Sequence, residues 1–165
     1  MAAATDALPI TAQSDCMEGP VAQFGRYIGQ WRIEDEQLQQ DGSTWAPGTA
    51  ERWDFYCVGN GEAVQDFWLP KGGNVGTNLR TWNPTSEQWE IAWTATLSPG
   101  IAVITAKQQP DGRIVMHYKD PVPDPLRRIT FYPPDAEGWR WTLEFSNDGG
   151  ENWFEVYRIK ASPAS

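Results

Sequence analysis

Residues 88–97 read Gln-Trp-Glu-Ile-Ala-Trp-Thr-Ala-Thr-Leu, with apolar side chains at every second position: Trp89, Ile91, Trp93, Ala95 and Leu97. A period of two is typical of a β-strand that buries one face. Outward from this stretch, further β-like runs and turn signals follow one another at roughly 8 to 14 residue spacing, which is typical of a sandwich or barrel. The sequence therefore predicts an all-β protein.

Ten runs are predicted as strands, at about residues 30–39, 49–58, 62–69, 75–82, 89–97, 100–108, 113–119, 127–132, 138–146 and 152–160. Before them, Phe24, Tyr27, Ile28 and Trp31 follow helical spacing, so residues 20–28 are predicted as a short helix. A helix this short cannot supply the crossover of a parallel βαβ unit. Closing ten antiparallel strands into an up-and-down barrel removes exposed strand edges and leaves room for one small ligand.

Composition limits the domain organisation and the partners. The 165 residues fit one domain, and we expect residues 19–160 to form the barrel between loose ends at 1–18 and 161–165. The balance of 22 acidic against 13 basic residues gives a net charge of −9, which disfavours nucleic-acid binding. No apolar run is long enough for a membrane span. The ten Trp, five Tyr and six Phe offer flat faces against which a ligand can stack.

Two cysteines, Cys16 and Cys57, do not make a disulfide framework in a chain of this length, so both are predicted to be free thiols. The first residues, Met-Ala-Ala-Ala-Thr-Asp, lack the charged and apolar regions of a secretory signal. A cytoplasmic location is the corresponding expectation.

Two segments near the ends of the chain resemble lipocalins and other calycins. The first, Phe24-Gly-Arg-Tyr-Ile-Gly-Gln-Trp-Arg-Ile33, is similar to the short helix and Gly-x-Trp strand that open those barrels. The second, Tyr157-Arg-Ile-Lys160, is similar to their final strand. The resemblance implies a calycin-like barrel in which Trp31 and Arg158 form a structural cation–π pair closing one end.

Two internal segments, Gly76–Pro84 and Ser146–Trp153, together with the strand number, are more similar to nitrobindin-type and related bacterial lipocalin-like domains. Nitrobindins hold haem through a His near the C-terminal end of the barrel. The last two predicted strands here contain no His, and His117 is the only one in the chain, so His117 or Tyr157 would have to coordinate iron. We expect no cofactor, and one His without a Cys-x-x-Cys pair does not build the usual zinc or iron sites.

Asp66, Arg80 and His117 are the candidate catalytic residues. Asp66 and Arg80 lie on neighbouring predicted strands, and they can pair inside the barrel if both faces point inward or pair in solvent if both point outward. His117 has the side chain best suited to act as a general base near neutral pH, with an exposed or structural histidine as the alternative.

Candidate ligand-binding residues share predicted faces with polar side chains or lie among aromatic ones. They are Trp68, Asn78, Trp82, Trp93, Tyr118, Trp141 and Tyr157. The predicted function is binding of a small, apolar, ring-containing molecule in the barrel cavity. One alternative is a cofactor-independent isomerase, cyclase or lyase acting by acid–base catalysis in that cavity, and another is a haem or interaction module. Aromatic residues on both faces of some strands also predict a homodimer.

Overall fold

The computed structural model describes residues 10–164. Short helices η1 (Gln13–Cys16), η2 (Gly19–Val21) and α1 (Ala22–Gly25) lie near the N-terminus. The strands are β1 (Ile10–Thr11), β2 (Gly29–Leu38), β3 (Trp45–Pro47), β4 (Ala50–Val58), β5 (Ala63–Pro70), β6 (Gly76–Asn83), β7 (Gln88–Ala95), β8 (Ser98–Gln108), β9 (Ile114–Asp120), β10 (Leu126–Phe131), β11 (Trp139–Ser146) and β12 (Phe154–Pro163).

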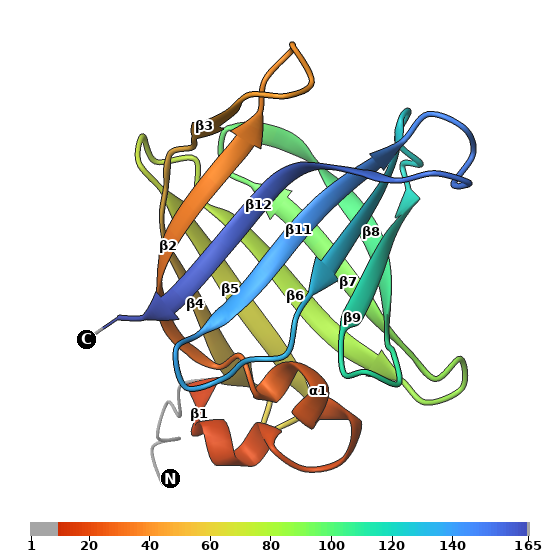
Figure 1. The fold of residues 1–165 in the computed structure, drawn as a ribbon. Coiled ribbons are helices and arrows are strands. Elements are labelled where there is room, and N and C mark those ends of the chain that lie inside the picture. Colours follow the sequence, from red (N-terminus) through yellow and green to blue (C-terminus); the bar gives the residue numbers. More distant parts are fainter. Residues whose placement is uncertain (1–9, 165) are drawn as a thin grey trace, which may run out of the picture.

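Strands β4 to β12 pair antiparallel in chain order, and β2 closes the sheet on itself (Figure 1). Along its length β2 pairs with β12, for example Ile33 with Ala161. On its other side β2 pairs with β4 through residues 29–32 and with β3 through residues 36–38. The result is a closed antiparallel barrel of ten strands, which confirms the predicted fold class; β1 and β3 are additional short strands.

Alternation along each strand divides the inside of the barrel from the outside. On β7, Trp89 and Ile91 are buried whereas Glu90 and Ala92 are exposed. The same pattern holds on β9, where Ile114 and Met116 are buried. These inward side chains join into one core, as expected for a sheet with one face in solvent.

The segment that contains α1 lies across one end of the barrel (Figure 1), and buried aromatic side chains fill that end. Phe24 and Tyr27 are fully buried there, and the Phe24 ring meets Trp89 edge-on with centroids 4.9 Å apart. Phe131 packs against both, with centroids 5.5 Å from Phe24 and 5.2 Å from Tyr27. The buried Tyr27 hydroxyl donates a hydrogen bond of 2.9 Å to the Tyr132 carbonyl oxygen. The predicted N-terminal helix thus closes one end of the barrel.

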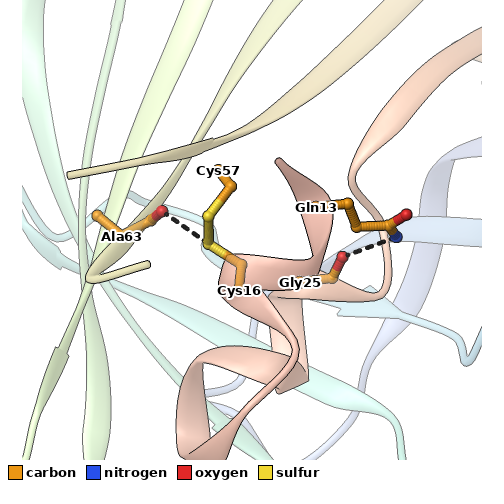
Figure 2. Close-up of a disulfide and its surroundings, with 5 residues drawn as sticks. All are labelled: Gln13, Cys16, Gly25, Cys57 and Ala63. Carbon is orange, nitrogen blue, oxygen red and sulfur yellow. Dashed lines mark hydrogen bonds between the residues drawn. A yellow bond between two sulfur atoms is a disulfide. The ribbon is translucent and has the colours of Figure 1, made fainter. Parts of the chain in front are cut away.

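Cys16 and Cys57 form a disulfide, so the prediction of free thiols is wrong (Figure 2). Both cysteines are fully buried, and the bond ties η1 to β4 beneath the barrel. The Cys16 sulfur also contacts the Ala63 carbonyl oxygen at 3.4 Å, without a hydrogen bond because a disulfide sulfur carries no hydrogen. Gly25 is required opposite, since a Cβ there would lie 1.9 Å from the Cys16 carbonyl oxygen. Disulfides are typical of oxidising compartments, so the cysteines no longer support the cytoplasmic expectation.

The ends of the described chain are more structured than expected. Within the predicted tail 1–18, Ile10 pairs with Val58 and Thr11 with Cys57. At the other end, β12 extends to Pro163, into the predicted tail 161–165. The remaining part of the first tail, residues 1–9, and residue 165 lie outside the described residues. Within residues 10–164, no helix has the length and apolar character needed to cross a bilayer.

Candidate functional site

A cavity of about 420 Å³ occupies the half of the barrel away from α1. Lys71, Gly72 and Asn74, in the turn between β5 and β6, contribute to its lining. This turn lies at the opposite end of the barrel from α1 (Figure 1). The aromatic packing around Phe24 therefore fills one half of the barrel, and the other half is hollow.

Most of the predicted ligand-binding residues line this cavity: Trp68, Asn78, Trp93, Tyr118, Trp141 and Tyr157. Trp53, which was not among the predicted ligand-binding residues, lines it as well. Its ring meets Trp68 edge-on at 5.1 Å and Trp141 at 6.1 Å, and Trp141 meets Tyr157 at 5.6 Å. The cavity thus has a continuous aromatic wall running from β4 and β5 across to β11 and β12.

Trp82 does not line the cavity, contrary to the prediction for it. Its ring instead meets Trp89 at 5.7 Å, and the indole nitrogen of Trp89 donates a hydrogen bond to Gln23 from the segment before β2. Trp82 comes near the end of β6, on the side of the barrel that α1 closes. Alternation placed Trp82 on the inward face of its strand. The sequence did not show at which end of the barrel axis that residue lies.

Asp66 and Arg80 meet inside the barrel, as the inward alternative predicted. The Arg80 Nη2 atom donates to Asp66 Oδ2 at 2.6 Å, and neither side chain has any exposed surface. The backbone and side-chain amides of Asn78 donate to the same carboxylate at 2.9 to 3.1 Å. The Arg80 guanidinium also lies over the rings of Phe24 and Phe55, at 4.8 and 5.2 Å. The pair forms the floor between the hollow half and the packed half.

His117 lies on the outer face of β9, away from the cavity. Its ring packs edge-on against Trp153 at 6.2 Å. Partial burial, together with the nearby positive charges of Lys119 and Arg128, lowers the pKa of His117. The exposed alternative therefore describes this residue, and it is not positioned to act on a molecule inside the barrel. Ile114 and Met116 are apolar and buried, so alternation along β9 places His117 on the outer face. This alternation was the signal available in the sequence.

Arg158 does not pair with Trp31, so the cation–π pair implied by the calycin resemblance is absent. Arg158 lies over the Trp45 ring at 4.0 Å and donates to Glu36 at 2.7 Å. The reason is the strand register, which sets Arg158 opposite Glu36 and Trp31 opposite Pro163. The Trp31 indole nitrogen instead donates to the Tyr27 carbonyl oxygen at 2.7 Å.

A carboxylate in the cavity wall, Asp35, was not predicted from the sequence. It lies on β2, is only 7% exposed, and accepts hydrogen bonds from the Tyr157 hydroxyl and from the Ala50 backbone amide. Burial raises the pKa of Tyr157, and the hydrogen bond to Asp35 and its negative charge raise it further. The available signal was alternation, because Asp35 follows Trp31 and Ile33 on the inward face of β2.

No protein-family model matches the sequence, and no curated protein sequence matches it. The class of the protein is thus given by its architecture, a closed ten-stranded antiparallel barrel that agrees with a calycin-like fold and encloses an aromatic cavity. Many buried aromatic residues around such a cavity are compatible with ligand binding.

Proposed function

We propose that this protein binds a small, mostly apolar, ring-containing molecule in the hollow half of its barrel. The observation that supports this most directly is the cavity of about 420 Å³ with Trp53, Trp68, Trp93 and Trp141 in its walls. Ligand sites are typically cavities of roughly 300–1,000 Å³, lined mainly by apolar side chains with a few polar groups. Asn78 and Asp35 are polar groups of this kind in the wall.

Binding is favoured over turnover by the positions of the candidate catalytic residues. An acid or base must come within hydrogen-bonding reach of its substrate. Asp66 is fully buried and does not line the cavity, Arg80 lines the cavity but is ion-paired with Asp66, and His117 faces the outside of the barrel. The alternative of a cofactor-independent isomerase, cyclase or lyase therefore loses two of its three candidate residues, Asp66 and His117.

Titration of intrinsic tryptophan fluorescence tests the proposal, since four Trp rings in the wall report on occupancy. The panel consists of small aromatic, terpenoid, polyketide and porphyrin compounds. A blocking variant, Ala95→Trp, places a large ring in the cavity, because Ala95 belongs to its lining. The matched control is Ala92→Trp, which adds the same ring to the exposed face of the same strand.

Saturable quenching that Ala95→Trp abolishes and Ala92→Trp preserves is the expected result. Quenching that survives Ala95→Trp would place the ligand elsewhere and contradict the proposal. Silence across the whole panel would favour an interaction module, and a Soret band in the purified protein would favour haem binding. The homodimer stays a prediction, and light scattering at micromolar concentration tests it.

A further inference from the structure

Asp35 differs from the other buried aspartates of the barrel in having no cation beside it. Asp66 pairs with Arg80 at 2.6 Å and Asp54 with Arg52 at 2.7 Å. Across residues 10–164, no Lys or Arg nitrogen lies within 4.0 Å of the Asp35 carboxylate. A buried carboxylate without a counter-charge is energetically costly. The structure thus contains an uncompensated negative charge, and this charge is in the cavity wall.

Hydrogen bonds stabilise Asp35 without neutralising it. The Tyr157 hydroxyl and the Ala50 amide are neutral donors. The basic residues of β12 nearest in sequence to Tyr157 are directed elsewhere, since Arg158 pairs with Glu36 and Lys160 is exposed. Two basic residues line the same cavity: Lys71 is exposed in the turn after β5, and Arg80 is ion-paired with Asp66. Among residues 10–164, no basic side chain therefore acts as the counter-ion of Asp35.

The walls of the cavity also suit a cation. The Tyr157 ring, whose hydroxyl holds Asp35, meets Trp141, and Trp141 meets Trp53. Ring faces of Trp and Tyr attract ammonium groups through their quadrupole, most strongly when the site is shielded from water. The net charge of −9 additionally raises the local concentration of small cations.

We infer that the molecule bound in this cavity is an organic cation, an ammonium group carried on an apolar or aromatic body, with Asp35 as its counter-ion. The inference rests on the proposed ligand-binding function and names its ligand class. The aromatic wall receives the apolar body, and the carboxylate together with Trp141 and Tyr157 surrounds the ammonium group.

A purely structural role for Asp35 is the competing explanation. Its Oδ1 accepts from Ala50, its backbone carbonyl accepts from Gly48, and a Cβ on Gly48 would lie 1.9 Å from Oδ2. These contacts fix the chain where β3 leads into β4. If Asp35 were purely structural, the cavity would bind a charged molecule and a neutral one of the same shape with similar affinity. A preference for the charged molecule therefore separates the two explanations.

The experiment uses the full chain and three probes of nearly equal size: benzyltrimethylammonium, its neutral isostere neopentylbenzene, and the anion phenylacetate. Tryptophan quenching measures each affinity. We expect the ammonium probe to bind about tenfold tighter than its isostere, because a shielded ammonium gains from both the rings and the carboxylate. Phenylacetate should bind more weakly than either.

Two substitutions assign the discrimination to Asp35. Asp35→Asn keeps a hydrogen-bonding group toward both Tyr157 and Ala50, and it should weaken ammonium binding about tenfold while leaving the isostere unchanged. Glu34→Gln removes the same charge from the exposed face of the same strand and is the matched control. Lys71→Gln removes a positive charge from the lining and should strengthen ammonium binding.

Equal affinity for the ammonium and the neutral probe, or a preference for phenylacetate, would overturn the inference and leave the ligand-binding function standing. So would tenfold discrimination that persists unchanged in Asp35→Asn. If Asp35→Asn fails to fold, the affinities of the wild-type protein for the three probes and the effect of Lys71→Gln on ammonium binding still test the inference. If none of the three probes and no compound of the wider panel binds, both the inference and the proposed function fail.

Discussion

Breaking the Cys16–Cys57 disulfide should lower the free energy of unfolding by about 4 kcal/mol. The two cysteines are 41 residues apart, and closing a loop of that length removes about 13 cal/mol/K of entropy from the unfolded chain, or about 4 kcal/mol at 25 °C. For a domain of this size the loss corresponds to a drop in melting temperature of about 8–16 °C. Since small domains unfold with about 5–15 kcal/mol in total, the reduced protein should be marginal at elevated temperature.

Equilibrium urea unfolding, followed by tryptophan fluorescence, measures this difference between oxidised and reduced protein. Reduction keeps both sulfur atoms in the buried site, so it separates the cross-link from the packing of the side chains. The Cys16→Ala/Cys57→Ala variant should agree with the reduced protein to within the packing of the two removed sulfurs. A thiol titration in denaturant first confirms that the oxidised sample contains no free thiol. A difference below about 1 kcal/mol would refute the reasoning, because the loop would then be constrained without the bond.

Three further substitutions or conditions test other parts of the barrel. Arg80→Met leaves Asp66 buried without its cation and should cost about 3–5 kcal/mol in urea unfolding, most of which returns when Asp66 is also replaced by Leu. Gly76→Ala puts a Cβ 2.0 Å from the Trp93 ring, so the ring must move, and ligand affinity should fall while the fold persists by circular dichroism. Burial raises the pKa of Tyr27 to about 12, so the folded state holds this proton more tightly than the unfolded state does. The contribution of Tyr27 to the free energy of unfolding should be full below pH 10 and should fall by about 2–3 kcal/mol as the pH rises to 12. Tyr27→Phe should reduce the slope of stability against pH in this range.

Local patterns were sufficient to predict the barrel. Alternation of the kind seen at Trp89 and Ile91 needs only neighbouring residues, and it located each of the ten strands to within a few residues. The same alternation predicted that Asp66 and Arg80 can meet, because their strands follow one another and pair in a hairpin. Contacts between consecutive strands are in effect local, so a single sequence can reveal them.

Contacts between distant segments could not be predicted in this way. Asp35 and Tyr157 are 122 residues apart, and only closure of the barrel brings β2 beside β12. The disulfide depends on how η1 docks under β4, which no periodicity records. The expected partner of Arg158 was wrong because the register between β12 and β2 is set by the whole barrel rather than by either strand.

The Asp66–Arg80 pair lies between two halves of the barrel that differ in how tightly they are packed. Below it, α1, the aromatic cluster and the disulfide supply most of the rigid packing. Above it, side chains such as Trp68 and Trp93 border a hollow space and carry less of the core. Substitutions in the upper half should therefore alter the shape of the cavity at a smaller cost in stability than substitutions in the lower half. Under the proposed ligand-binding function, specificity can then change, by evolution or by redesign, while the packed half stays the same.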